Sequence, residues 1–540
     1  MNVFEIFHTK EFDTKTILKR NGKDLSLKEF KEFVSVAVDF LNSQSCQNAV
    51  ILSSDAFDFI VWFFACIAAK KEIFLLTDSS KLKYLEFEYV LLDKILDRKC
   101  DKNIEYDQID CHKVSINFFT SGSTSKPKMI TKTLTNTIIE AEDVFAEFLS
   151  DYKNPLRVLT STKSQHMFPF IYYFILPLVY CEKLLMDTTD VCYPDDADFK
   201  DSVFVSTPSF LEKFEKYNVK NEYSPYVIFT AGAKIKDSVR KYLEQESTVI
   251  DIYGSTETGT VGFKRHSSEN ALTCINRVEI EPDENSQIVV KSPYFIETSC
   301  TLGDIVNIVD KKNFILMNRA DRILKIQEKR ISAPEVEEIV QKNSFVQECY
   351  CFKSAEKLAC AVALSKEGID FFFENGFCYT KITSYLKNYL NGKVEIVPQK
   401  WKFLYEIPKT VTGKIDKAKI EQIFATNVSM PFVFDVKKDS DYVEYGVVFP
   451  KSCNFFEGHF TNFPVLPGVV QLYFANYFAQ EAFDVKVSTE SVKKIKFSKI
   501  IKPDEKLTLI FEKKGNSITY TYKKDEQICS GGVMTVNEKD

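Results

Sequence analysis

Residues 118–133, FFTSGSTSKPKMITKT, follow an apolar strand-like run and bring together the groups that a polyphosphate needs. A phosphate-binding loop offers inward-pointing backbone N–H groups, hydroxyl donors and a cation on a flexible stem. Gly122 permits close approach of the backbone, and Lys128 supplies the charge. The hydroxyl side chains are those of Thr120, Ser121, Ser123 and Thr124. The segment lacks the G-x-x-x-x-G-K-[ST] pattern of the Walker A loop, so it predicts a phosphate-binding loop of another kind.

Further motifs follow this loop along the chain. They are YGSTETG (253–259), LGDIVNI (302–308), NRADRILKIQEKRISAPEVEEIV (318–340) and PKTVTGKID (408–416). Taken in this order with the loop, they resemble the motifs of the acyl-adenylate-forming superfamily. That superfamily includes acyl- and aryl-CoA ligases, the adenylation domains of peptide synthetases, and luciferases. The resemblance covers residues 1–424 and implies a ligase that uses ATP to activate a carboxylic acid.

The resemblance implies a role for each motif in the attack of a carboxylate on the α-phosphate of ATP. Charge collects on the phosphate oxygens in this reaction and must be met by cations and Mg²⁺. Residues 120–128 would hold the β- and γ-phosphates, Glu257 would hold Mg²⁺, and Thr256 would lie near the α-phosphate. Lys414 would bridge the carboxylate and the α-phosphate from a loop that is mobile until substrate arrives.

The same resemblance implies a binding site for the nucleoside. Asp304 would accept hydrogen bonds from the ribose hydroxyls, which suits an ionised carboxylate, and Arg319 would support the same ribose. Tyr253 would stack flat on the adenine beside the backbone of residues 231–233. The residues expected around adenine are Tyr253, Gly254, Gly232 and Ala233.

The third motif also carries the expected hinge. In the second half-reaction of such ligases a thiol attacks the acyl adenylate, and the small lobe first swings about a residue that matches Asp321. Further along the same motif, we expect Glu337 and Glu338 to form only a solvated helix face.

His166, in STKSQHMFPF, stands where the family often has a histidine or an aromatic residue lining the acyl pocket. A pocket-wall or core role and a catalytic role both remain open. The aromatic residues that follow favour an apolar or aromatic carboxylic acid, without deciding between fatty and aryl. They are Phe168, Phe170, Tyr172 and Tyr173.

Three residues depart from the family pattern. Glu328 stands where a glycine usually lets the pantetheine arm pass, and Ser125 and Met129 replace glycines of the phosphate loop. A glutamate adds bulk and negative charge beside a phosphorylated arm. Adenylation therefore remains the expectation, whereas free CoA is a poorer acceptor than the phosphopantetheine of a holo acyl carrier protein.

Near the C-terminus, NFFEGHFTNFPVLPGVVQL (454–472) resembles the catalytic stretch of hotdog-fold 3-hydroxyacyl-carrier-protein dehydratases. The resemblance implies that His459 removes the α-proton of a thioester. The N–H of Gly468, at the positive end of a helix, would polarise its carbonyl. Tyr473 stands where these enzymes carry Asp or Glu, and a phenol with a pKa of about 10 cannot replace a carboxylate in the proton step. Dehydration, acyl binding and dimerisation through edge strands all remain open for this domain.

The elements that must position these residues follow from the pattern of apolar runs. Short β-rich runs alternate with helical stretches up to about residue 318, which predicts an α/β sheet with helices on both faces. The runs are NAVILSS (48–54), EIFLLT (72–77), VFVSTP (203–208) and YVIFTAG (226–232). We predict a large lobe over 1–318, a small α+β lobe over 319–424, a linker over 425–440 and a hotdog domain over 441–540. In the last domain, alternating strands are expected over 442–449, 506–514 and 517–524, and a helix over 468–483.

Composition narrows the class of protein. The 540 residues carry a formal charge of −6 and no sustained basic block, which argues against a nucleic-acid binder. The longest apolar runs, 59–69 and 168–180, fall short of the roughly 18–20 residues of a membrane span and predict core helices. The 14 cysteines show no zinc-type spacing; without a secretory leader they indicate reduced thiols of a cytoplasmic protein.

The sequence as a whole predicts an ATP-dependent acid:thiol ligase that loads an aryl or acyl carboxylate on a holo acyl carrier protein. The cofactors would be ATP, Mg²⁺ and phosphopantetheine. The hotdog domain would act on the same acyl chain and form a homodimer. The arrangement is similar to the ligase and dehydratase pairs of bacterial aryl polyene or fatty-acid-like pathways. Two alternatives remain: a ligase that uses free CoA, and an acyl-binding or assembly scaffold whose adenylation site has decayed.

Overall fold

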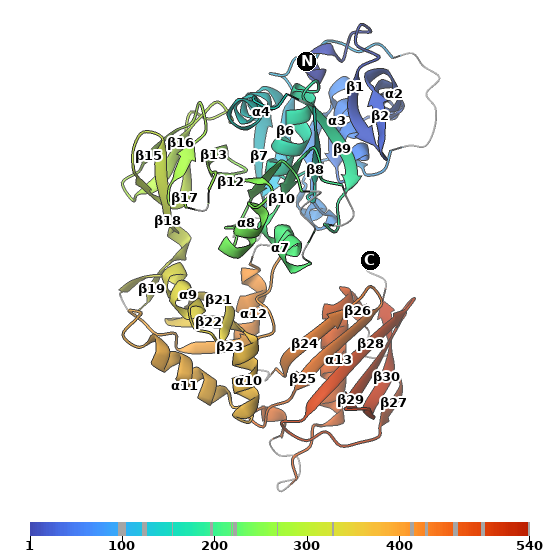
Figure 1. Ribbon diagram of the computed structural model, residues 1–540. Coiled ribbons are helices and arrows are strands. Elements are labelled where there is room, and N and C mark those ends of the chain that lie inside the picture. Colours follow the sequence, from blue (N-terminus) through green and yellow to red (C-terminus); the bar gives the residue numbers. More distant parts are fainter. Residues whose placement is uncertain are drawn as a thin grey trace. The chain divides into compact units, whose positions relative to one another are not determined.

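A computed structural model describes most of the chain (Figure 1). The described residues are 1–95, 104–120, 127–153, 155–194, 198–217, 219, 224–266, 268–326, 329–410, 415–426, 430–456, 463–487 and 492–537. The chain divides into two compact units, Met1–Ala320 and Asp321–Asp540. Within the described residues, no helix is both long and apolar enough to cross a membrane.

A large mixed sheet runs through the first unit in the order β15-β16-β17-β18-β14-β13-β12-β11-β10-β8-β9-β1-β2. Its central strands are parallel: β8 (Leu156–Thr160), β9 (Leu184–Asp190), β10 (Ser202–Ser206), β11 (Val227–Ala231) and β12 (Thr248–Ser255). One flank is antiparallel: β13 (Gly259–Lys264), β14 (Leu272–Cys274), β15 (Glu279–Pro282), β16 (Gln287–Lys291), β17 (Cys300–Ile308) and β18 (Asn313–Arg319). The other flank ends in β1 (Thr16–Arg20) and β2 (Lys23–Ser26).

A second sheet of this unit has the order β5-β3-β4-β6-β7. Its strands are β3 (Asn48–Ile51), β4 (Glu72–Leu75), β5 (Val90–Leu92), β6 (Ser115–Thr120) and β7 (Lys128–Thr133). The apolar runs predicted at 48–54, 72–77, 203–208 and 226–232 form β3, β4, β10 and β11, so the predicted α/β class is confirmed.

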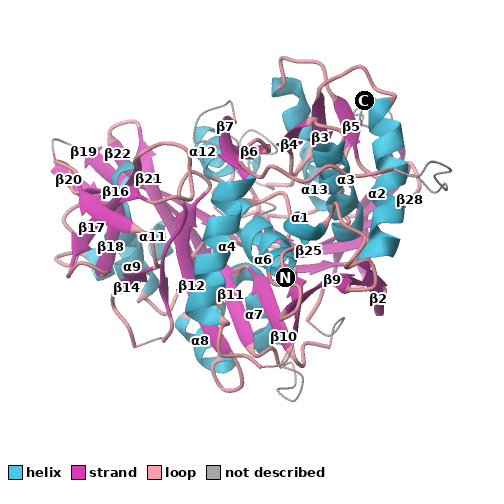
Figure 2. Cartoon of the chain, turned by 90° about the horizontal axis from the view of Figure 1, so that it is seen from above, coloured by secondary structure: helices cyan, strands magenta, loops and turns pink. Residues whose placement is uncertain are grey.

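Helices cover the sheets of the first unit. They are α1 (Val3–Ile6), α2 (Leu27–Asn42), α3 (Ala56–Ala68), α4 (Leu134–Phe148), α5 (Met167–Pro169), α6 (Leu176–Val179), α7 (Pro208–Lys216) and α8 (Asp237–Leu243), with a 3-10 turn at Ser79–Tyr84 and a π turn at Phe170–Ile175. The side chain of Ser26 begins α2 and that of Thr133 begins α4, each in a reciprocal capping box. In both views α7 and α8 lie together beside β10, β11 and β12, and their apolar side chains share one core with these strands (Figure 1 and Figure 2).

The second unit begins with a small α+β region. A 3-10 turn, Ala320–Arg322, leads into its strands β19 (Ile323–Ile326), β20 (Lys329–Ser332), β21 (Val346–Ser354), β22 (Lys357–Leu364) and β23 (Lys400–Leu404). Its helices are α9 (Ala333–Gln341), α10 (Lys366–Glu374), α11 (Tyr379–Leu390) and α12 (Lys417–Ala425).

The expectation that Glu337 lies on a solvated helix face is wrong. Its carboxylate is largely buried, pairs with the guanidinium of Arg322 and accepts the N–H of Cys351. Glu338 is exposed, as expected, and pairs with Lys342.

A curled antiparallel sheet forms the C-terminal region, with the order β24-β25-β28-β29-β30-β26 and with β27 also pairing with β30. The strands are β24 (Phe432–Lys438), β25 (Tyr442–Val448), β26 (Lys486–Val487), β27 (Lys493–Phe497), β28 (Lys506–Lys514), β29 (Ser517–Lys524) and β30 (Gln527–Asn537). A 3-10 turn, Asn454–Phe456, precedes helix α13 (Gly468–Phe483), which packs its apolar side on the sheet. The strands and the helix predicted here from sequence are confirmed, and the arrangement is that of a hotdog domain.

The predicted linker over 425–440 is wrong in one respect, because residues 432–438 form β24 and pair with β25. Phe432 and Phe434 of this strand nevertheless point into the core of the small α+β region. The ring of Phe432 lies 4.7 Å from that of Phe372, and the ring of Phe434 lies 5.2 Å from that of Phe373. A single strand therefore belongs to the sheet of one region and to the apolar core of the other.

We expect Phe432→Ala to unfold the small α+β region together with the C-terminal sheet. The side chain is 1% exposed, and deleting a buried Phe side chain costs about 3–5 kcal/mol. The chain has two tryptophans, Trp62 and Trp401. In a Trp62→Phe background, the urea unfolding of the small region can be followed by the fluorescence of Trp401, which packs in its core.

The control is Ile528→Ala, because Ile528 is 52% exposed on β30. This change should alter the free energy of unfolding by less than about 0.5 kcal/mol. An unchanged Trp401 transition in Phe432→Ala would show that the two regions fold independently.

Candidate active site

The phosphate-binding loop predicted from sequence joins β6 to β7. These strands pair antiparallel, with Thr120 opposite Lys128. Lys128 is exposed at the start of β7. Ser121, Gly122, Ser123 and Thr124 lie outside the described residues.

The motif YGSTETG lies at the carboxyl end of β12. Because β11 and β12 are parallel neighbours, the loop with Gly232 and Ala233 leaves the sheet at the same edge as Tyr253. Ligands of open α/β sheets bind at this edge. The turn that follows, with Thr256 and Glu257, is half-buried. It is also tight: a Cβ on Gly254 would approach the carbonyl oxygen of Gly259 to 2.2 Å.

Asp304 and Arg319 come together across β17 and β18, where they are Cα partners. A distance of 3.8 Å separates Arg319 Nη1 from Asp304 Oδ2. Tyr253 joins them: burial raises the pKa of its hydroxyl well above the usual value, and the neighbouring carboxylate of Asp304 raises it further. The structure thus brings together three residues that the sequence places far apart, and they form the clearest part of the candidate site.

His166 lies half-buried at the N-terminal end of α5. Three of the aromatic residues after it are core residues, as predicted for the apolar run over 168–180. Phe170, Tyr172 and Tyr173 are at most 1% exposed and belong to the main core. Both tyrosine hydroxyls are used internally, since Tyr172 bonds with Thr260 Oγ1 at 2.9 Å and Tyr173 donates to the carbonyl of Asp187. Phe168 is half-buried and remains available beside His166.

Other predicted residues lie outside the described part of the chain or lack a described side chain. Lys414, Glu328, Ser125 and His459 fall outside the described residues. Asp321 is the first residue of the second unit, and its backbone is described without its side chain. Their roles stay predictions.

In the C-terminal region, Gly468 is the first residue of α13. A Cβ at this position would approach the ring of Phe497 to 2.7 Å, so the contact requires a glycine. Tyr473 follows on the same helix and is 49% exposed. Its ring meets that of Phe474 edge-on at 5.0 Å.

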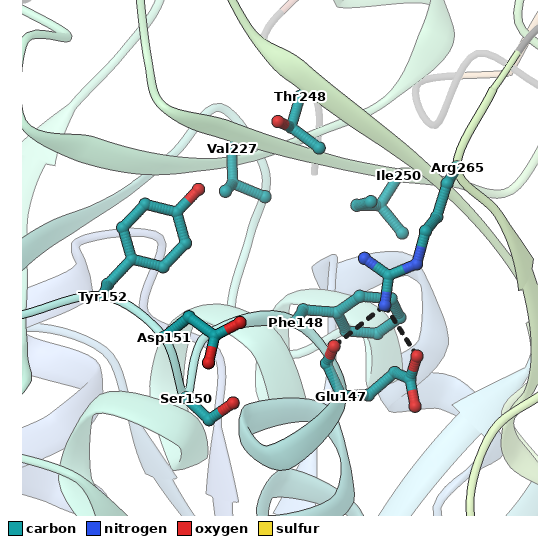
Figure 3. Close-up of a pocket in the computed structure, with 9 residues that line it drawn as sticks. All are labelled: Glu147, Phe148, Ser150, Asp151, Tyr152, Val227, Thr248, Ile250 and Arg265. Carbon is teal, nitrogen blue, oxygen red and sulfur yellow. Dashed lines mark hydrogen bonds and ion pairs between the residues drawn. The ribbon is translucent and has the colours of Figure 1, made fainter.

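A cavity of about 340 Å³ lies elsewhere in the first unit (Figure 3). Val227 and Thr248 line it at the amino ends of β11 and β12, opposite the edge that carries Tyr253. Arg265 also lines it and donates to the backbone and the carboxylate of Glu147. None of the candidate residues lines this cavity.

Sequence reasoning missed two buried ionisable residues near the turn that carries Glu257, namely Lys132 and Glu140. They follow the phosphate-binding loop in KTLTNTIIEAE, where a lysine and a glutamate interrupt an amphipathic pattern. A charge on the buried face of a helix or strand is a usable signal, but which side is buried becomes clear only in the fold.

Comparison with known families agrees with this arrangement. Residues 77–286 match the model of the AMP-binding enzyme family, and residues 435–533 match that of the ApeI-like family, described as ApeI dehydratase. The chain therefore contains an AMP-binding domain followed by a C-terminal ApeI-like dehydratase domain. The matched AMP-binding segment contains the phosphate-binding loop and the Glu257 turn.

Several known proteins are similar to this chain. Over 326 residues it is 24% identical to 4-coumarate–CoA ligase of Cereibacter sphaeroides, and the match covers 57% of this chain and 73% of that protein. ATP-bound MatB of Rhodopseudomonas palustris has a TM-score of 0.63 at 13% identity over 78% of this chain and 99% of its own. The o-succinylbenzoate CoA synthetase of Bacillus subtilis, with its acyl-adenylate intermediate, has 0.63 at 14% identity over 78% and 98%. The two structural likenesses show that this chain shares the fold of these proteins.

We expect Asp304→Asn to weaken ATP binding by about tenfold or more, because a charge-assisted hydrogen bond to the ribose is lost. Isothermal titration with ATP measures the change. Protein stability should stay nearly constant, since the partner Arg319 is 57% exposed and such pairs contribute little.

The matched control is Glu281→Gln. This residue pairs with Lys291 across the antiparallel strands β15 and β16 of the same sheet. Equal ATP affinity of Asp304→Asn and Glu281→Gln would remove Asp304 from the nucleotide site.

Proposed function

We propose that the AMP-binding ligase adenylates an aryl or acyl carboxylate and transfers the acyl group to a phosphopantetheine thiol. In the first step a carboxylate oxygen attacks the α-phosphorus of ATP and pyrophosphate leaves. In the second step the thiol attacks the acyl carbon and AMP leaves. The observation that supports this most is the meeting of Tyr253, Asp304 and Arg319 near the edge of the sheet where β12 ends.

The described residues fit the nucleotide and its metal. Asp304 would accept from the ribose hydroxyls while Arg319 holds its carboxylate in place. Within the described residues no three His, Cys, Asp or Glu side chains gather as a metal site. Glu257 would bind Mg²⁺ together with phosphate and water oxygens, a common arrangement for this ion. Mg²⁺ would supply charge neutralisation at the phosphates, and Lys414 would add a cation at the reacting carboxylate.

For the acceptor we propose the phosphopantetheine of a separate holo acyl carrier protein. Glu328 supports this, because it replaces the glycine past which the pantetheine arm of CoA would run. Free CoA is the second candidate, which the name of the relative from Cereibacter sphaeroides favours. The free thiols of the described cysteines suit the cytoplasm, where we place the enzyme.

The ApeI-like domain would act on a 3-hydroxyacyl thioester of the same growing chain. We propose His459 as the base and the N–H of Gly468, at the start of α13, as the donor to the thioester carbonyl. The place of the usual acidic residue is taken by Tyr473, whose phenol can donate a hydrogen bond but is not the carboxylate that the proton step of such enzymes uses. Acyl binding without turnover is therefore the alternative for this domain.

We predict that the protein releases pyrophosphate when ATP, Mg²⁺ and a suitable aryl or acyl acid are added. A coupled pyrophosphate assay over a panel of acids measures this. Lys414→Ala should lower the rate by about 100-fold or more while ATP still binds, because the cation at the α-phosphate is lost in the transition state.

Mass spectrometry of the product with CoA or with holo carrier protein then identifies the acceptor. Wild-type turnover by Lys414→Ala would contradict the assigned role of this lysine. No pyrophosphate with any acid would favour the scaffold over both kinds of ligase.

We also propose that the ApeI-like domain forms a homodimer through β27. All five residues of this strand are exposed, and its Phe497 packs on Gly468, so the exposed apolar surface continues to Val469 and Tyr473 of α13. Val469 is 73% exposed, which is unusual for a valine. Exposed edge strands of this kind are templates for pairing, and lysines such as Lys494 and Lys496 limit it to a specific partner.

Analytical ultracentrifugation should therefore show a dimer for the wild type and a monomer for Phe497→Asp, because a buried unpaired carboxylate opposes association. The control Tyr217→Asp, at a tyrosine 58% exposed in the first unit, should remain dimeric. A monomeric wild type, or a dimeric Phe497→Asp, would be inconsistent with pairing through β27.

A further inference from the structure

Lys132 and Glu140 are two buried charged residues that the proposed chemistry does not use. Their exposed fractions are 0% and 1%, and both lie directly after the phosphate-binding loop, Lys132 on β7 and Glu140 on α4. Lysine and glutamate are almost never fully buried unless they are paired. Their hydrogen bonds show what they do in the fold.

The two side chains hold opposite sides of the turn that carries Glu257. Lys132 Nζ donates to the carbonyl oxygen of Glu257 at 3.2 Å and to that of Tyr294 at 2.6 Å. Glu140 Oε1 accepts from the backbone N–H of Thr260 at 2.7 Å and from its hydroxyl at 2.8 Å. Since β12 ends at Ser255 and β13 begins at Gly259, these bonds anchor the connection within the turn and just after it.

Close packing leaves this turn little freedom. Gly259 has a φ of +71°, in the region that favours glycine, and a Cβ there would come within 2.3 Å of Glu140 Oε2. Inside the turn, the hydroxyls of Ser255 and Thr258 lie 3.1 Å apart, and the N–H of Thr258 also donates to Ser255. The two charged groups therefore restrict the backbone of the turn and, with it, the position of the Glu257 carboxylate.

The charges of the pair are compatible with burial because each offsets the other. Burial lowers the pKa of Lys132 to about 8, and the carboxylate of Glu140 opposes that shift. Burial raises the pKa of Glu140, and Lys132 opposes it. Apolar residues of similar volume usually serve stability as well as two buried opposite charges do. Stability alone therefore does not explain the pair, whereas fixed geometry at the turn does.

Strand β7 also connects this turn with the phosphate-binding loop. Side chains alternate along a strand, so Lys128 and Lys132 lie on the same face, about 13 Å apart along β7. Strand β7 thus carries the proposed phosphate ligand, Lys128, at its start and Lys132, which bonds to the turn of the proposed metal ligand, near its end.

We propose that Lys132 and Glu140 are positioning residues that hold the Glu257 carboxylate at the distance from the phosphate-binding loop that Mg²⁺·ATP requires. The proposal rests on the proposed function, because it takes Glu257 as the magnesium ligand. Neither residue contacts the substrate; both act on the backbone of the turn.

The test is the double variant Lys132→Met/Glu140→Gln, which removes both charges and so leaves no unpaired charge buried. The new glutamine would keep an acceptor for Thr260. The new methionine would lose the bonds to Glu257 and Tyr294, so a loss of Mn²⁺ affinity in this variant is due to the loss of Lys132. The probe is Mn²⁺ with α,β-methylene-ATP, followed by electron paramagnetic resonance of free Mn²⁺. We expect the dissociation constant of Mn²⁺ to rise by about tenfold or more, as for other residues that orient metal ligands.

Thermal unfolding of the same variants separates positioning from stability. Lys132→Met alone should lower the melting temperature, and adding Glu140→Gln should restore it without restoring Mn²⁺ affinity. The control Lys31→Met removes a largely buried lysine of α2 that bonds to the carbonyl of Thr9 and to Asp13, and it should leave Mn²⁺ affinity unchanged.

Two results would overturn the inference. Wild-type Mn²⁺ affinity in the folded double variant would show that the turn needs no support from Lys132. A wild-type protein that binds the nucleotide analogue but no Mn²⁺ would remove Glu257 as a metal ligand, and the inference with it. A wild-type protein that binds neither would instead contradict the proposed ligase function as a whole.

Discussion

The parallel pairing of β11 with β12 determines where the first unit can bind a nucleotide. Both strands end at one edge, so the loop with Gly232 and the turn with Glu257 emerge side by side. The antiparallel flank of the same sheet then returns Asp304 and Arg319 to the neighbourhood of Tyr253. One continuous sheet thereby fixes the distances among groups that would contact adenine, ribose and metal.

Two buried charged residues hold the Glu257 turn at that edge of the sheet. Lys132 lies on β7 of the second sheet, and Glu140 lies on α4. Both bond to the backbone in or just after the Glu257 turn. The two sheets of the unit thus meet through charge-assisted bonds rather than through apolar contact alone. In the second unit the regions are joined by apolar packing and by an ion pair. Strand β24 belongs to the curled sheet and places Phe432 in the core of the small α+β region, and Lys419 of α12 pairs with Glu481 of α13. These two regions form one compact unit.

Much of the fold could be predicted from sequence because local patterns determine it. The alternation of apolar runs located β3, β4, β10 and β11, and the amphipathic run at 468–483 is α13. The candidate site was located through motifs, and the structure brings Asp304, Arg319 and Tyr253 together as those motifs imply.

The predictions that failed depend on contacts between distant segments. Glu337 looks solvated until Arg322 is placed beside it. Residues 432–438 lack the regular alternation of a half-buried strand, because their two faces meet different regions of the second unit.

The most direct measurement is a crystal structure of the protein with Mg²⁺ and α,β-methylene-ATP. The account predicts the nucleotide at the carboxyl ends of β11 and β12, with ribose hydroxyls about 2.5–2.7 Å from the Asp304 carboxylate. It also predicts the metal about 2.0–2.1 Å from an oxygen of Glu257. A nucleotide bound in another place, such as the cavity beside Arg265, or a ribose that does not touch Asp304, would contradict the account.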